Sequence, residues 1–222
     1  MVSFTDMEPA VVAAATQDQI AFFDQLRQDF EYKVYDFDSP PNLREHLQGL
    51  GFVQQDEEAF LVLESALWKT PGGSIDGLTI ERITDPSKLP DYVAAEQAIW
   101  PEGNSSWRLQ QYTDMLGSDP DAVSIYCAYL NGRPVGTGRV SFPPRSRFVD
   151  LNGGGVHASM RGRGIFTALL ARRIEEARAR GYEWVSVDAA PMSRPILLRK
   201  GFQHVCWTYP MLHRFERSAE PA

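Results

Sequence analysis

The sequence predicts an α/β (α+β) fold in which a mixed sheet has helices on both of its faces. Two observations lead to this prediction. Two strand-like runs in the middle of the chain are joined by Asn131-Gly132, the strongest short-range signal for a hairpin. Later in the chain, strand-like runs alternate with helical patterns, as in strand–helix–strand units. Hairpin strands followed by such units imply antiparallel and parallel neighbours in one sheet.

The first third of the chain is expected to form a small domain. Ile20 and Phe23 belong to an apolar pattern at helical spacing, and residues 70–74 (TPGGS) have the composition of a linker. We therefore predict an N-terminal α/β extension over residues 1–74 and a second domain over residues 75–222. The elements expected in the extension are a helix over 9–30, a strand over 30–37, a helix from Asn42 to Leu50 that Gly51 ends, and a strand over 59–63.

The second domain carries the hairpin and the later units. Gly153-Gly154-Gly155 lies within one expected strand, where glycines mark a bulge or a close approach to the backbone. In the longest expected helix, Glu176 and Arg180 form an i,i+4 pair. The buried stripe of that helix consists of Phe166, Leu170, Ile174 and Ala177. The expected strands are 78–83, 122–130, 135–142, 147–156, 184–188 and 204–209, and the expected helices are 90–99, 106–116, 162–180 and 194–200.

One internal similarity links the two ends of the chain. Phe30-Glu31-Tyr32 with Asp36 matches Tyr182-Glu183-Trp184 with Asp188 at the same spacing. Each segment continues through a proline turn and a short helix into Gly-Phe. We infer that the N-terminal extension is a degenerate copy of the last strand–helix–strand unit, the alternative being that such units are common.

Charge is unevenly distributed. The chain has 22 Lys and Arg against 29 Asp and Glu, a net charge of −7, which argues against a general nucleic-acid binder. Residues 131–200 nevertheless hold 13 basic and 5 acidic residues, against 9 and 24 elsewhere. This pattern is expected where a polyanionic ligand binds locally, and the alternative is a solvated, arginine-rich helix.

Other features bound the class of protein. Cys127 and Cys206 have no CxxC partner, so we expect inert core thiols and neither a disulfide scaffold nor a metal site. No apolar run approaches the length of a membrane span, and no signal peptide is recognisable. We expect a cytoplasmic protein that uses neither a membrane nor a nucleic acid as partner.

The most informative segment runs from Val156 to Phe166. An expected strand ends there, a glycine-rich turn follows and an amphipathic helix begins. Free backbone N–H groups and the positive end of a helix dipole then point at one place, which makes an anion site. The segment is neither a Walker loop nor G-x-G-x-x-G.

Two motifs resemble those of the GNAT (GCN5-related) N-acetyltransferase superfamily. Arg161-Gly162-Arg163-Gly164 resembles its R/Q-x-x-G-x-G/A signature, and residues 189–202 look like its closing helix and Gly-Phe turn. The resemblance covers roughly residues 78–212. It implies a mixed, mostly antiparallel central sheet flanked by helices. The first part of the chain is similar to an extension that some bacterial members carry.

The resemblance implies acetyl-CoA as a co-substrate and no metal. Pyrophosphate would bind the backbone amides of Arg161, Gly162, Arg163, Gly164, Ile165 and Phe166. The pantetheine arm would pair with the strand end at Gly155, Val156 and His157, and Ser193 would also contact the cofactor. Arg199 and Lys200 are further phosphate candidates.

Catalytic groups are less evident. Asp150 lies eleven residues before Arg161, where some members carry a glutamate base, and the alternative is a structural strand residue. The backbone N–H of Val156 would hold the oxyanion. The sequence departs from the family at Phe166, where Gly or Ala is usual, and at Leu197, where a Tyr often acts as general acid. Ser193 or Tyr209 would replace that acid, or the thiolate would leave unassisted.

The sequence therefore indicates an acetyl-CoA-dependent N-acetyltransferase that transfers acetyl to a primary amine of a small molecule or peptide by direct attack on the thioester. Trp100, Trp107, Tyr112 and Glu102 would line the acceptor site or be core and surface residues. The alternative function is a catalytically weakened acyl-CoA-binding sensor or interaction protein. A homodimer is the default expectation for oligomeric state.

Overall fold

The computed structural model describes residues 1–3, 5–101 and 107–215. The chain divides into two compact units. Unit 1 combines Met1–Leu61 with the segment from Asp188 onward, and unit 2 is Val62–Val187. The C-terminal segment thus joins the N-terminal one, so these units do not coincide with the predicted domains 1–74 and 75–222, which remain a prediction.

Unit 1 is a small sheet with helices on one face. Its strand β10 (Gln203–His213) pairs antiparallel with β2 (Phe30–Tyr35) and β3 (Val53–Gln54), and β1 (Val2–Ser3) pairs parallel with β2. Helices α1 (Pro9–Gln25) and α2 (Leu43–Gly49) cover the sheet, and α6 (Arg194–Arg199) precedes β10. The core consists of Val12, Phe30, Tyr32, Val34, Leu43, Leu47, Phe52 and Met211.

The expected order strand–helix–Gly recurs in both copies of the internal similarity. Gly51 follows α2 with φ +90°, and Gly201 follows α6 with φ +96°. A left-handed residue at this place ends a helix without the steric cost that a Cβ carries there. The first helix ends at Gln25, five residues before its expected end, and Arg27 after it has φ +54°.

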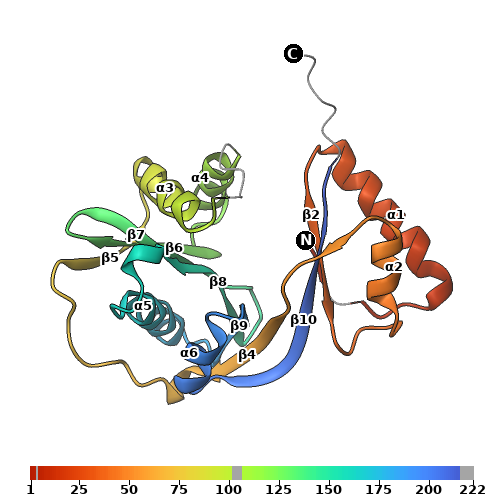
Figure 1. Cartoon of the computed structure of the whole chain (residues 1–222). Coiled ribbons are helices and arrows are strands. Elements are labelled where there is room, and N and C mark those ends of the chain that lie inside the picture. Colours follow the sequence, from red (N-terminus) through yellow and green to blue (C-terminus); the bar gives the residue numbers. More distant parts are fainter. Residues whose placement is uncertain (4, 102–106, 216–222) are drawn as a thin grey trace, which may run out of the picture. The chain divides into compact units, whose positions relative to one another are not determined.

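Unit 2 is a sheet with helices on both faces (Figure 1). Strands β5 (Leu78–Ile83), β6 (Val123–Leu130), β7 (Arg133–Ser141) and β8 (Phe148–Val156) pair antiparallel in that order. Helices α3 (Leu89–Ile99) and α4 (Arg108–Ser118) cover one face, and α5 (Ile165–Ala179) covers the other. Strands β4 (Glu58–Glu64) and β9 (Trp184–Ala189) cross the boundaries between the units, and three short 3-10 turns, η1 (Ser65–Leu67), η2 (Pro86–Lys88) and η3 (Ala158–Met160), complete the order. The mixed, mostly antiparallel sheet confirms the predicted fold class.

The β8 strand has a free edge beyond Asp150. It pairs parallel with β9 through three residue pairs, Phe148–Trp184, Val149–Val185 and Asp150–Ser186. Over its remaining residues, 151–156, the described pairs are with β7 alone. Backbone groups on the other side of this stretch are therefore available to a ligand.

The three glycines of β8 confirm the expectation of a bulge and a close approach. The register of β7 and β8 shifts beside Gly153, which has φ +55°. A Cβ on Gly155 would lie 2.7 Å from the indole of Trp100, and one on Gly154 would lie 3.0 Å from the guanidinium of Arg173. The groups that approach the backbone are side chains from the helices on opposite faces of the sheet.

Helix α5 begins at Ile165, three residues later than expected, because Gly162 and Gly164 have φ +75° and +83°. Of the expected buried stripe, Leu170, Ile174 and Ala177 are buried. Phe166 is only half-buried, and Ile165 occupies the core position beside it. In the first turn of α5, the buried position is therefore Ile165, one residue before the predicted Phe166.

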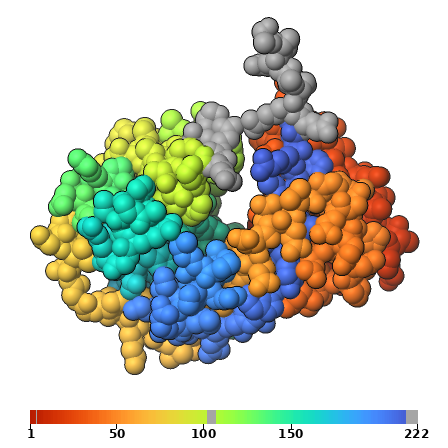
Figure 2. Space-filling model, viewed as in Figure 1, coloured from red at the N-terminus to blue at the C-terminus, as the bar shows by residue number. Residues whose placement is uncertain are grey.

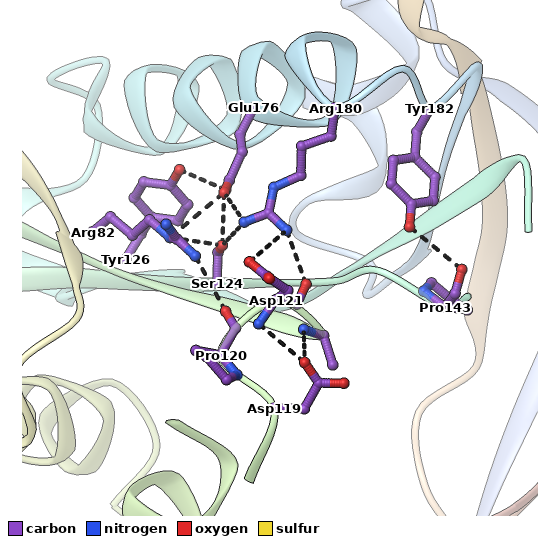
Figure 3. Close-up of polar contacts among 11 residues, drawn as sticks. Arg82, Asp119, Pro120, Asp121, Ser124, Tyr126, Pro143, Glu176, Arg180 and Tyr182 are labelled. Atoms are coloured by element: carbon purple, nitrogen blue, oxygen red, sulfur yellow. Dashed lines mark hydrogen bonds and ion pairs between the residues drawn. The ribbon is translucent and has the colours of Figure 1, made fainter. Parts of the chain in front are cut away.

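A polar network fixes the end of α5 to the sheet (Figure 3). Glu176 accepts hydrogen bonds from the hydroxyls of Ser124 at 2.8 Å and Tyr126 at 2.7 Å. Arg180 lies 2.7 Å from the same carboxylate, which confirms the predicted i,i+4 pair, and Arg82 lies at 3.5 Å. Two arginines from different elements thereby share one carboxylate, which joins α5 to β5 and β6.

Among the described residues, no helix is long and apolar enough to cross a membrane.

Both cysteines are buried, and burial raises the pKa of the Cys127 thiol to about 12 and that of the Cys206 thiol to about 11. We predict that neither thiol reacts with iodoacetamide at pH 8 in the folded protein, since only the thiolate is nucleophilic. Mass spectrometry should find both labelled in urea; labelling of either one without denaturant would contradict this prediction.

A second prediction concerns the glycine under Trp100. Gly155→Ala should lower the free energy of unfolding by about 1–3 kcal/mol, because the new Cβ overlaps Trp100 and Ile99. Urea unfolding measures the loss. Gly117→Ala in α4 is the matched control, since no atom lies within 4 Å of its Cβ position, and it should not destabilise the protein. Equal stability of the two variants would show that the packing is looser than described.

Candidate functional site

The turn between β8 and α5 has the geometry of an anion site. The 3-10 turn η3 leads to Gly162 and Gly164, both left-handed, and Gly164 is the residue before the first turn of α5. The amides of that first turn have no acceptor within the helix, and the helix dipole adds positive charge at the same end. Residues 161–164 are exposed at the surface, in the segment coloured cyan in Figure 2.

The two arginines of the turn differ in their surroundings. The Arg161 Nε donates to the backbone carbonyl oxygen of Val156 at 3.2 Å, so this side chain folds back over the end of β8. Arg163 is exposed beside the two glycines. Arg161 therefore holds the turn against the strand, and Arg163 presents a charge to an anion that approaches from solvent.

The end of β8 offers the backbone of Val156 at the free edge. The N–H of His157 donates to the carbonyl oxygen of Val135 on β7 at 2.9 Å. Adjacent residues of a strand direct their backbone groups to opposite sides. The groups of Val156 and Gly154 therefore face away from β7, whereas those of Gly155 and His157 face β7.

The three residues predicted to contact pantetheine differ in their backbone environment, and the contact itself stays a prediction. Gly155 and His157 do not offer free backbone groups, since those groups face β7. The ring of His157 has its Nδ1 2.8 Å from the hydroxyl of Ser159, within its own turn. Of these three residues, Val156 has a backbone N–H that faces away from β7, while its carbonyl oxygen accepts from Arg161. Gly154 is a second residue on the same edge.

Asp150 lies on β8, within the predicted strand, and its assignment as the base stays a prediction. Five residues of strand lie between Asp150 and Val156, which are on the order of 15–20 Å apart. The Asp150 carboxylate accepts a hydrogen bond from the Ser186 hydroxyl, where β8 still pairs with β9.

The residues predicted around the closing helix belong to unit 1. The Ser193 hydroxyl donates to the carbonyl oxygen of Ala190 at 3.1 Å, just before α6. Leu197 is 1% exposed and part of the packed interior. Arg199 and Lys200 are exposed at the end of the same helix. Tyr209 has the guanidinium of Arg44 4.0 Å from its ring centre.

A buried charge cluster connects α3 and α4 with β7. Glu96 is 3% exposed and lies 2.9 Å from both Arg139 and Arg108. Arg139 also donates to the hydroxyls of Tyr92 at 3.0 Å and Tyr112 at 2.6 Å. Burial raises the pKa of Tyr92 to about 12 and raises that of Tyr112, so both remain hydroxyl donors near neutral pH.

Sequence reasoning missed this cluster, although a signal was present. Tyr92, Ala95 and Glu96 share the buried face of α3, so a glutamate occupies a core position on an apolar stripe. A carboxylate there is retained only with cationic or hydrogen-bonding partners. The sequence gives no indication that the partners are Arg139 and Arg108.

The aromatic residues expected near the acceptor have separate environments. Tyr112 is 3% exposed in the core, whereas Trp100 and Trp107 are 39% and 49% exposed. Trp100 lies against Gly155, next to Val156. Glu102 lies outside the described residues. In the part of the chain that the structure describes, no group of three or more His, Cys, Asp or Glu side chains could hold a metal ion.

Comparison with known proteins agrees with this architecture. The structure is similar to a GCN5-related N-acetyltransferase from Kribbella flavida, with a TM-score of 0.69 and 15% identity, covering 93% of this chain and 77% of that chain. It is also similar to a functionally unknown conserved protein from Staphylococcus epidermidis, with a TM-score of 0.70 and 18% identity, covering 96% of this chain and 84% of that chain. At these identities the likeness establishes the fold.

A family match adds to the structural likeness. Residues 90–195 match the model of the Acetyltransferase (GNAT) family. The matched segment contains the buried cluster, the free edge of β8 and the glycine turn before α5. No curated protein matches the sequence. Residues 90–195 therefore match a family of acetyltransferases, and the structural likeness shows that the fold is the same.

We predict that Glu96→Gln lowers the free energy of unfolding by about 3 kcal/mol, because it leaves two half-buried guanidinium groups without their buried anion. Urea unfolding followed by circular dichroism measures the change. Lys88→Met breaks the exposed pair with Glu81 and serves as the control, with no measurable loss expected. If both variants were as stable as the parent, the cluster would contribute nothing to the fold.

Proposed function

We propose that this protein is an acetyl-CoA-dependent N-acetyltransferase that acetylates a primary amine of a small molecule or peptide. The observation that supports it best is the continuity of two features within unit 2. The free edge of β8 ends at Val156, and the anion-binding turn begins five residues later at Arg161. An extended ligand with a strand-like arm and a pyrophosphate fits that succession of backbone groups.

The proposed cofactor contacts are backbone contacts in the main. The amides from Gly162 to Phe166 would bind the pyrophosphate, and Arg163 would add a point charge. The pantetheine arm would pair with Val156 and Gly154 as an added strand. Phe166 does not obstruct this arrangement, because its amide belongs to the first turn of α5 while its side chain is half-buried.

The proposed chemistry is direct transfer. The amine nitrogen attacks the thioester carbon, and the N–H of Val156 stabilises the oxyanion that forms. The C–S bond then breaks, its electron pair leaves with sulfur as thiolate, and the amine proton passes to water. Glu96 is held by two arginines and Asp150 by Ser186, so neither carboxylate is a free base beside Val156. In this proposal the acceptor reacts as the fraction already deprotonated in solution.

A second candidate function is an acyl-CoA-binding sensor or interaction protein with weakened catalysis. The observation that favours it is Leu197, which is buried and cannot donate a proton to the departing thiolate. Both functions require the same cofactor site. They differ in whether bound acetyl-CoA is consumed when an amine is supplied.

Calorimetry with acetyl-CoA, followed by thiol release against polyamines, amino acids, aminoglycosides and short peptides, tests this proposal. We expect Gly164→Val to weaken binding at least tenfold, since a β-branched residue is strained at φ +83° and disturbs the first turn of α5. Arg163→Ala should weaken binding less and reduce its salt dependence.

Arg178→Ala is the matched control, because this exposed arginine lies in the last turn of the same helix. Its affinity for acetyl-CoA should equal that of the parent. Binding without thiol release for any amine would favour the sensor. No binding by the parent protein, or equal binding by Gly164→Val, would overturn the cofactor assignment.

A further inference from the structure

Arg173 is a buried cation for which the described residues offer no carboxylate. It projects from the middle of α5 and is 2% exposed. Its recorded acceptors are the backbone carbonyl oxygens of Leu169 at 3.2 Å and Arg139 at 3.5 Å. Neutral carbonyl groups satisfy donors but do not cancel a charge, and a buried charge without a counter-ion is costly.

Two glycines, Gly138 on β7 and Gly154 on β8, leave room for this guanidinium beside the sheet. A Cβ on Gly138 would lie 2.9 Å from its Nε, and a Cβ on Gly154 would lie 3.0 Å from its terminal nitrogen. The guanidinium therefore lies directly against the backbone of β7 and β8, where any other residue would displace it. Gly154 is two residues before Val156 and shares its free edge.

The charged and titratable groups around Arg173 leave the region positive. Burial lowers the pKa of Arg173 to about 10, so the side chain is cationic near neutral pH. Arg139 repels it, and the hydroxyls of Tyr92 and Tyr126 are neutral there. The carboxylate of Glu96 is already bound by Arg139 and Arg108. Glu176 on the same helix is bound by Arg180 and Arg82.

We propose that Arg173 stabilises negative charge on the reacting thioester through the backbone of β8, and that it substitutes for the general acid missing at Leu197. This inference rests on the proposed acetyl-CoA site along β8. During transfer, negative charge forms first on the carbonyl oxygen and then on sulfur as the C–S bond breaks. A fixed cation beneath the strand edge that binds the thioester stabilises the negative charge on oxygen and then on sulfur. It does so without donating a proton.

The expected size of the effect is measurable. Gly154 and Val156 are about 7 Å apart along a strand, so the cation lies on the order of 8 Å from a group bound at Val156. A unit charge at this distance in a protein interior shifts the pKa of an anion by roughly one unit or more. A bound CoA thiol should therefore have a pKa about one unit below its ordinary value of about 8.5.

The test is an ultraviolet absorbance titration of the CoA thiolate bound to the full-length protein, together with steady-state kinetics. Arg173→Met should return the bound thiol pKa to its ordinary value and lower kcat about tenfold or more. The KM for acetyl-CoA should change less than twofold, because the guanidinium does not touch the phosphates. Arg173→Lys keeps the charge and should retain most of both effects.

Arg172→Met is the matched control, since it removes an exposed charge from the adjacent position of the same helix. It should leave the thiol pKa and kcat unchanged. Removing an uncompensated buried charge should not reduce stability, so Arg173→Met is expected to unfold at the same or a higher urea concentration.

Three results would overturn the inference while leaving the proposed function intact. The first is a bound thiol pKa in the parent protein at or above that of free CoA. The second is an Arg173→Met variant with unchanged thiol pKa and kcat. The third is an Arg173→Lys variant as impaired as Arg173→Met, which would assign Arg173 a packing role. Failure of the parent to bind CoA would overturn the proposed function itself.

Discussion

The free edge of β8 is the constraint on which the rest of unit 2 depends. After Asp150 the strand continues for six residues with a described partner on one side only, so Val156 and Gly154 have backbone groups that face away from the sheet. Such groups are costly to leave unpaired in an interior, and water or a ligand must satisfy them. The same stretch contains Gly153, Gly154 and Gly155, and this is why Trp100 can lie against one face and Arg173 against the other. Strand, glycines and neighbouring side chains form one arrangement that a single added Cβ disturbs.

The interior of unit 2 is also more highly charged than a small core usually is. Glu96 holds Arg139 and Arg108, and Glu176 holds Arg180 and Arg82. Each carboxylate joins a helix to strands, so these networks fix helices on both faces of the sheet that carries the site. Arg173 lies between the two networks without an anion of its own. A stable fold does not require this charge, and the reaction proposed along β8 would use it, since that reaction places negative charge on oxygen and then on sulfur.

Local sequence signals predicted the elements well where one residue type, such as glycine, determines the backbone conformation. Asn131-Gly132 predicted the hairpin because both residues accept positive φ, and they have φ +51° and +77°. The glycine turn before α5 was predicted for the same reason, although Gly162 and Gly164 delayed the helix to Ile165. Long-range pairing could not be predicted. Periodicity shows that Glu96 and Arg173 occupy buried stripes, but it does not show that Arg139 from β7 reaches Glu96 or that two glycines make room for Arg173. Spacing in sequence also does not show that the pairing of β8 with β9 ends at Asp150.

Amide hydrogen exchange of the full-length protein, with and without CoA, tests the central claim most directly. We predict that CoA protects the amides of Val156 and of the first turn of α5. The amide of His157 should not gain protection, since it already donates to Val135. Protection confined to other segments, or none at saturating CoA, would contradict the claim that the free edge of β8 and the start of α5 bind the cofactor.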